Sequence, residues 1–138
     1  MRKAIITLLL AMPLMCFGQT VIKTRTLKST DLGNQKLEAV IGNDTTYVLY
    51  IKTGARAYPA LSCVLGTKER AIKLLMFLYE LDIKKGDIVD LENESHNLVT
   101  KNSLGGLLVY SQGRQFSGQL RKPNIKGFIE AIYEFSNQ

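Results

Sequence analysis

Two segments of the chain carry apolar residues at the spacing of an amphipathic helix, and strand-like segments precede each of them. In residues 67–82 the pattern is formed at positions i, i+3, i+4 and i+7 by Ile72, Leu75, Met76 and Tyr79. After Pro123, a residue favoured at helix starts, it is formed by Ile125, Phe128, Ile129 and Ile132. An amphipathic helix buries its apolar face against another layer, so the rest of the chain has to provide a sheet for both helices.

The segments outside the two helices show the period-two alternation and the β-branched residues of strands, with turn-forming residues between them. The most apolar of them, residues 47–51, has apolar side chains on both faces, as is typical of a central strand. We predict strands at residues 21–28, 36–41, 45–52, 59–65, 87–93, 97–101, 105–111 and 115–121. The predicted fold is α+β, with an antiparallel β-sheet of about six to eight strands packed against two helices.

The two halves of this predicted domain resemble each other. Ile72-Lys73 and Tyr79-Glu80 in the first helix match Ile125-Lys126 and Tyr133-Glu134 in the second, at an offset of about 53 residues. Each helix follows a hairpin and a further strand, so a duplicated β-β-β-α unit is one interpretation, which requires a one-residue insertion. The alternative is convergent patterning, because any two strand–strand–helix units share such marks.

The beginning of the chain has the layout of a secretory signal peptide. A positively charged start is followed by an apolar run at residues 4–14 and then by Cys16 and Gly18, small residues three positions from each other's side of a cleavage site. The run is shorter than the ~20 residues that a membrane-spanning helix needs. We therefore predict a signal peptide at residues 1–18, no membrane span, and an exported single domain at residues 19–138, in the periplasm or outside the cell.

Cys16 raises the alternative of a lipid anchor. Bacterial lipoprotein signals have small residues just before the modified cysteine, whereas Leu14 and Met15 stand there in this chain, so cleavage without lipidation is favoured. After cleavage Cys63 is the remaining cysteine, and a secreted domain with one cysteine has no internal disulfide. A hydrophobic fraction of 46% with 22% charged residues is enough for a folded core that carries the stability alone.

The sequence offers few groups for catalysis. Two cysteines and one histidine cannot build a structural zinc site. Cys63 stands among apolar neighbours, where burial would raise its pKa and make it a poor nucleophile for a pair with His96. Gly105 and Gly106 lead into a strand and not into a helix, so they do not form a phosphate-binding loop. We therefore expect a protein without enzymatic activity and without a cofactor.

One cluster of ionisable residues supports an enzymatic alternative. Asp90, Glu92, Glu94 and His96 alternate in the sequence, and they would share one face of a straight strand. Carboxylates and an imidazole can hold a divalent cation, so the alternative is a small metal-dependent hydrolase that uses Asp90, Glu92 and His96. At ~3.3 Å per residue all four cannot reach one ion, and a solvated strand edge is the favoured interpretation.

Aromatic and basic residues gather at the predicted hairpins. Arginine with tyrosine is a typical composition of contact surfaces, and hairpins that lie side by side would bring Arg56 and Arg114 together. The candidate binding residues are Tyr50, Arg56, Tyr58, Tyr110, Arg114 and Phe116. The net charge is +6, but export argues against a nucleic-acid partner.

The first predicted helix has a second possible role in binding. Its apolar surface is wider than a single stripe, because further apolar residues flank the pattern: Leu74, Phe77, Leu78 and Leu81. Such a helix is either buried on more than one side or docks on another chain. We therefore expect an exported, non-catalytic binding domain that contacts a protein partner or a second copy of itself through this helix or through the hairpin tips.

Overall fold

The computed structural model describes residues 21–30, 34–54, 60–103 and 105–137. The predicted signal peptide, residues 1–18, lies outside this part of the chain. The first half of the described chain contains four strands and a helix: β1 (Lys23–Thr30), β2 (Gln35–Ile41), β3 (Thr45–Lys52), β4 (Ala60–Gly66) and α2 (Lys68–Glu80). The second half repeats this order: β5 (Ile88–Asp90), β6 (Leu98–Lys101), β7 (Leu107–Tyr110), β8 (Ser117–Leu120) and α3 (Lys122–Ser136).

The predicted α+β class with antiparallel strands and two helices is confirmed. The eight strands form two four-stranded antiparallel sheets, ordered β1-β2-β3-β4 and β5-β6-β7-β8. Each helix therefore follows four strands, so the repeated unit is β-β-β-β-α and is one strand longer than the unit expected from the sequence. In the described chain, no helix has the length and apolar character that crossing a membrane requires.

Strand register in the first sheet brings its apolar residues onto one face. Leu37 pairs with Leu49, and Leu49 pairs with Cys63, so a row of buried side chains runs across β2, β3 and β4. Because side chains alternate along a strand, Ile51 and Leu61, two positions along their strands, lie on the same face. This face is the floor on which the helices pack.

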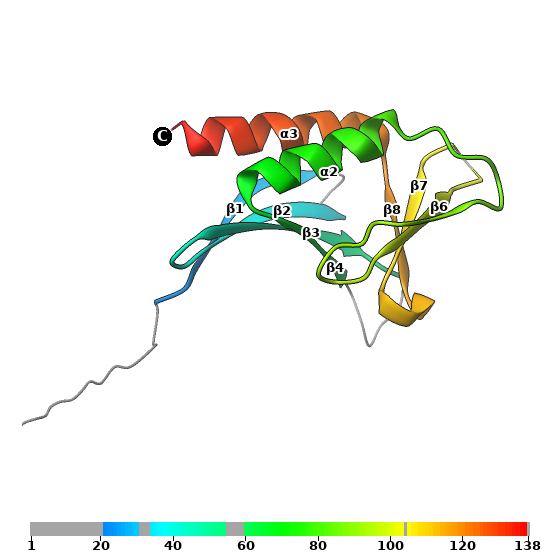
Figure 1. Ribbon diagram of the computed structural model, residues 1–138, viewed down its shortest axis with the longest axis horizontal. Helices are drawn as coiled ribbons and strands as arrows, with labels where there is room; N and C mark the ends of the chain where they lie inside the picture. The colour runs from blue at the N-terminus through cyan, green and yellow to red at the C-terminus, as the bar shows by residue number, and fades with distance from the viewer. Residues whose placement is uncertain (1–20, 31–33, 55–59, 104, 138) are drawn as a thin grey trace, which may run out of the picture.

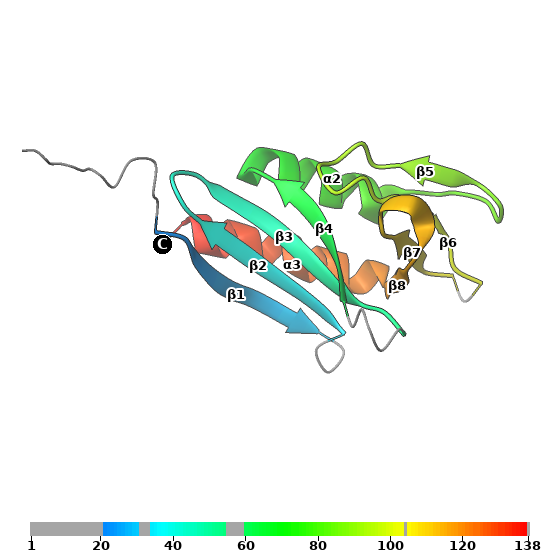
Figure 2. The same ribbon diagram turned by 90° about the horizontal axis from the view of Figure 1, so that it is seen from below.

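Both helices cover the first sheet. In Figure 1, α2 and α3 lie side by side above it, with α2 over β3 and β4 and α3 over β1. Figure 2, seen from below, shows the other face of that sheet, which none of the described helices covers. The residues that the helices bury in the core are Ala71, Leu75 and Leu78 from α2 and Ile125, Phe128 and Ile132 from α3. The second unit thus contributes its helix to the first unit's sheet, and the two units share one core.

The two units also meet where β8 crosses the end of β3. Gly118 lies so close to β3 that an added Cβ would stand 2.8 Å from the carbonyl oxygen of Lys52 and would clash with Ile51. Beside this contact the buried Gln35 side chain donates a 2.9 Å hydrogen bond to the carbonyl of Gln119. Asn124, at the start of α3, donates a 3.0 Å hydrogen bond to the Gln35 side chain. The junction therefore depends on the absence of a side chain at position 118.

Positions of the helices correspond at an offset of 54. The N-cap residues are Thr67 and Arg121, and the first buried positions are Ala71 and Ile125. The expected close approach at Gly127 is confirmed, because a Cβ there would lie 2.8 Å from Cε of Lys28 on β1. The atom that it meets belongs to the flexible end of a side chain, so this contact is softer than the one at the β8 crossing.

A groove between α2 and the segment after β5

A groove of about 740 Å³ separates α2 from the residues that follow β5. Its lining comes from three parts of the chain that are distant in sequence: the end of β4, one side of α2, and residues 90–94. The lining residues are Val64, Leu65, Gly66, Arg70, Lys73, Leu74, Phe77, Asp90, Leu91, Glu92, Asn93 and Glu94. The groove thus has an apolar floor between two charged walls.

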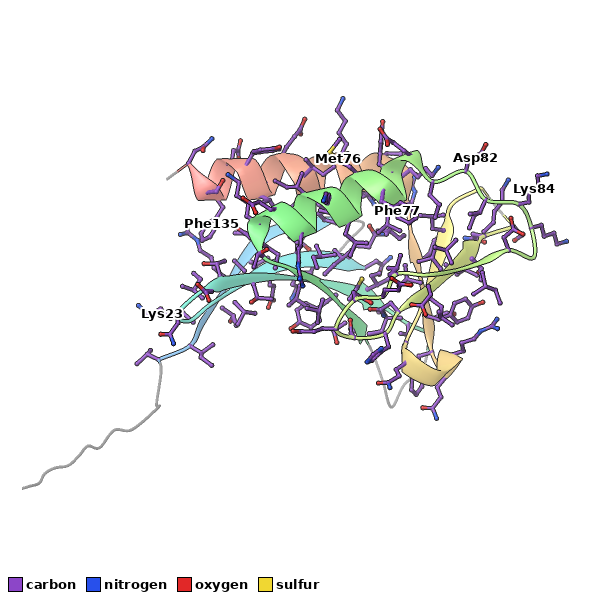
Figure 3. All side chains as sticks on the ribbon, in the orientation of Figure 1. Lys23, Met76, Phe77, Asp82, Lys84 and Phe135 are labelled. Atoms are coloured by element: carbon purple, nitrogen blue, oxygen red, sulfur yellow. The ribbon has the colours of Figure 1, made fainter. Side chains whose placement is uncertain are left out.

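The helical wall is one face of α2. Arg70, Lys73, Leu74 and Phe77 fall at the i, i+3, i+4 and i+7 positions of this face, next to the face that enters the core. Phe77 is 46% exposed although it is a large apolar residue. In Figure 3, Phe77 lies on the side of α2 nearer the second unit, and Met76 on the upper side of the helix. The helix therefore presents an aromatic ring and two cations to the groove.

The opposite wall is a bent segment and not a continuation of β5, which ends at Asp90. The Asp90 side chain accepts a 2.8 Å hydrogen bond from the backbone N–H of Glu92. Glu92 and His96 have left-handed backbones, with φ of 53° and 51°, which strands do not adopt. The alternation expected for residues 87–93 is broken at these bends, so the four ionisable residues do not share one strand face.

Side chains attach this bent segment to the outer edge of β4. Ser95 accepts a 2.8 Å hydrogen bond from the backbone N–H of Val64, and Asn93 donates a 2.9 Å hydrogen bond to the carbonyl of Val64. The buried Asn97 amide donates to the carbonyls of Ser62 at 3.3 Å and Tyr110 at 2.9 Å. The edge of β4 is thus satisfied by side chains where a neighbouring strand would otherwise pair with it. These bonds fix the wall opposite α2.

The charges of the two walls do not neutralise each other. Arg70 and Lys73 lie on α2, and three carboxylates lie on the opposite wall: Asp90, Glu92 and Glu94. Among these described residues no ion pair joins the two walls. The groove is therefore wide enough to keep opposite charges apart, and both signs remain available to a molecule between them.

The structure does not gather the metal ligands expected in the alternative. Asp90 and Glu92 lie in the groove wall, and His96 is exposed beyond the bend. Within the described ranges, no three His, Cys, Asp or Glu side chains lie close enough together to hold a metal ion.

Cys63 lies under α2, fully inside the core. Burial raises the pKa of the Cys63 thiol to about 12, and a hydrogen bond from Asn93, 3.6 Å from Sγ, opposes this in part. The expected raised pKa of this cysteine is confirmed. Because the neighbouring amide comes from Asn93 and His96 is exposed, the structure does not present Cys63 and His96 as a catalytic pair.

The hairpin candidates are partly brought together. The guanidinium of Arg114 lies 5.1 Å from the centre of the Tyr110 ring, and Phe116 donates a backbone hydrogen bond to Ser111 in the same hairpin. Tyr50 pairs in register with Ser62, whose carbonyl shares the Asn97 amide with that of Tyr110. The two other candidates, Arg56 and Tyr58, lie outside the described residues, as does the expected pairing of Arg56 with Arg114.

Searches among protein-family models, curated proteins and solved structures find no match for the chain. The residues that sequence reasoning missed are the charged ones of the groove, above all Arg70 and Lys73. Their neighbours gave a signal, because Leu74 and Phe77 widened the apolar surface of the helix beyond one stripe. The opposite wall had no such signal, since its position depends on tertiary hydrogen bonds.

Proposed function

We propose that the protein is an exported, non-catalytic binding domain, and that its groove holds an extended segment of a partner polypeptide. The observation that carries this proposal is the uncovered face of α2, where Phe77 remains 46% exposed beside a cavity of about 740 Å³. Ligand pockets in proteins commonly measure about 300–1,000 Å³. A large aromatic residue at the centre of such a concavity is a typical anchor for a partner.

Charge complementarity favours a polypeptide as the occupant. A segment lying in the groove would direct acidic side chains toward Arg70 and Lys73 and basic side chains toward Asp90 and Glu92, with an apolar side chain on Phe77. Polypeptides carry all three kinds of group at regular spacing, together with main-chain donors and acceptors. An apolar small molecule would leave both charged walls without partners.

The composition of the groove supports binding in preference to nucleophilic catalysis. Its described lining contains carboxylates, cations and apolar side chains but no Ser, Thr, Cys or His. Nucleophilic catalysis needs such a group beside a base. The groove offers contacts of both charge signs and an anchor, which are the requirements of recognition.

A peptide library provides the test, because the natural partner is unidentified. Peptides are selected on the full-length protein, and their affinity is measured by calorimetry. We expect Phe77→Ala to weaken binding at least about tenfold, since a central aromatic anchor is lost. Met76→Ala is the matched control, because Met76 is 47% exposed on the same helix but does not line the groove. Peptides that bind the two variants equally well would contradict the proposal.

The charged walls allow a second arm of the same experiment. Lys73→Glu reverses one charge on the helical wall, and we expect it to shift the selected peptides from acidic to basic residues at the position facing α2. An unchanged preference would mean that the peptides bind elsewhere.

Export has its own measurement. The leader predicts a mature chain that begins at Gln19, and mass spectrometry of the protein from its native cell determines this end. A chain that still carries residues 1–18 would contradict export by this route, and a lipid on Cys16 would replace release with anchoring.

A further inference from the structure

A second, smaller cavity lies at the junction of the two units. Its volume is about 280 Å³. It is lined by Asn34, Gln35, Lys52, Thr53, Gly54, Gln119 and Arg121. No lining residue comes from the groove, so this cavity is a separate site.

The walls of this cavity are held by buried polar groups. Gln35 is 2% exposed, and its amide is fixed on both sides by the hydrogen bonds to Gln119 and from Asn124. The backbone N–H of Lys52 donates a 2.7 Å hydrogen bond to the carbonyl of Asn34, which closes a third side. Thr53 is 7% exposed. The shape of the cavity is therefore set by the fold and not by mobile surface side chains.

The fold brings two cations to this cavity. Lys52 ends β3, and Arg121 is the N-cap residue of α3. They are neighbours because β8, which leads into Arg121, crosses the end of β3 at the tight Gly118 contact. None of the seven lining residues is acidic. Two like charges at one small polar cavity repel each other, and an anion between them would relieve this repulsion.

We propose that this cavity binds a tetrahedral oxyanion of the phosphate class. Two cations match the double negative charge of phosphate, and Arg is suited to paired hydrogen bonds with phosphate oxygens. The neutral amides of Asn34 and Gln119 add polar surface without opposing charge. Inorganic phosphate and the phosphate group of an organic monoester share this chemistry.

Calorimetry on the full chain tests the proposal with inorganic phosphate and with phenyl phosphate, at constant ionic strength maintained with chloride. We expect saturable binding that Lys52→Met weakens at least about tenfold, as the loss of one charge-assisted contact predicts. Lys101→Met removes an exposed cation outside the cavity and is the matched control, with affinity unchanged within about twofold. Equal loss in the two variants, or no saturable binding to either probe, would overturn the proposal.

Arg121→Gln is the second variant, because Arg121 reaches the cavity from the other unit. It should weaken phosphate binding as Lys52→Met does, and urea unfolding without phosphate shows whether the variant is still folded. If Arg121→Gln folds normally and binds phosphate like the unchanged protein, the cavity is not the site. The stronger ligand of the two probes identifies the source of the anion, and the result is independent of peptide binding in the groove.

Discussion

The outer side of α3 is covered by β1, whereas the outer side of α2 is separated from β5 by the groove. These two sides correspond in the repeated units: at the offset of 54 positions, Lys73 matches Gly127 and Phe77 matches Ala131. On α3 the glycine lies under the Lys28 side chain of β1. On α2 both positions face open space. The same repeated element is thus closed in one unit and open in the other.

Side-chain size explains this difference. Gly127 and Ala131 leave room for a strand to approach α3, and Arg25 of β1 also stacks on Phe135, 5.5 Å from the ring centre. Lys73 and Phe77 fill the corresponding space on α2. The first strands differ in length as well, because β1 has eight residues and β5 has three. A repeat that is closed for stability in one unit can therefore carry a binding surface in the other.

The largest expected effect separates the two helices at one matched position. Phe128 and Leu74 correspond, but Phe128 is fully buried, whereas Leu74 lies partly exposed in the groove wall. Phe128→Ala should lower the free energy of unfolding by about 3–5 kcal/mol through lost burial and a cavity. Leu74→Ala should cost about 1–2 kcal/mol, since less apolar area is lost. Urea unfolding measures both, and equal costs would mean that the two sides are equally closed.

Gly118→Ala addresses the junction that both units share. The new Cβ would lie 2.8 Å from the backbone oxygen of Lys52, so β8 has to move away from β3. We expect a loss of about 1–3 kcal/mol in urea unfolding, as for overpacked sites. Gly106→Ala is the control, because a Cβ there meets its nearest neighbour, the Leu120 oxygen, at an ordinary 3.4 Å. A junction that tolerates Gly118→Ala as well as the control would not be close-packed.

Cys63 reports on the closed interior through pH. Burial raises the pKa of its thiol to about 12 in the folded protein, while an unfolded thiol titrates near 8.5 (about). Above that pH the unfolded chain releases a proton that the folded chain keeps, so stability falls by about 1.4 kcal/mol per pH unit up to the folded pKa. Burial also raises the pKa of Tyr47, so the quantity to compare is the slope with and without Cys63→Ala.

The variant should remove this part of the slope between about pH 9 and 10.5, measured by urea unfolding. Below about pH 8 the two proteins should respond to pH alike, because the thiol is protonated in both states. An identical alkaline slope in both proteins would show that Cys63 titrates normally and is not sealed in the core.

Gly127→Ala has the smallest expected effect and the opposite sign. Alanine is favoured over glycine inside a helix by about 1 kcal/mol. Its Cβ would displace only the end of the Lys28 side chain, which is flexible. We expect a change between no effect and a gain of about 1 kcal/mol in thermal unfolding, with the full gain in the Lys28→Ala background. A clear destabilisation would mean that α3 has no room for a methyl group against β1.

The sequence was sufficient to predict the elements and their order, because each carries its own period of apolar residues. It could not predict that the strands divide between two sheets. That division depends on Asn93 and Asn97, whose side chains occupy the edge of β4 in place of a fifth strand. Hydrogen bonds between residues 29 to 35 positions apart leave no local pattern.

The candidate site was predictable on one side only. The wide apolar surface around Phe77 indicated a docking helix, and that expectation agrees with the exposed ring in the groove. The hairpin candidates rested on the assumption that residues near each other in sequence meet in space. The structure brings Tyr110 and Arg114 together, while the opposite charges of the groove come from segments that only the tertiary fold unites.

The rate at which an introduced thiol is modified tests the contrast between the two helix sides most directly. Phe77→Cys and Ala131→Cys are compared in a Cys16→Ser background, with and without a peptide selected on the protein. We predict fast modification at position 77, slowed at least about tenfold by the peptide, and slow modification at position 131 with or without it. Equal rates at the two positions, or a rate at position 77 that the peptide leaves unchanged, would contradict an open and binding side on α2.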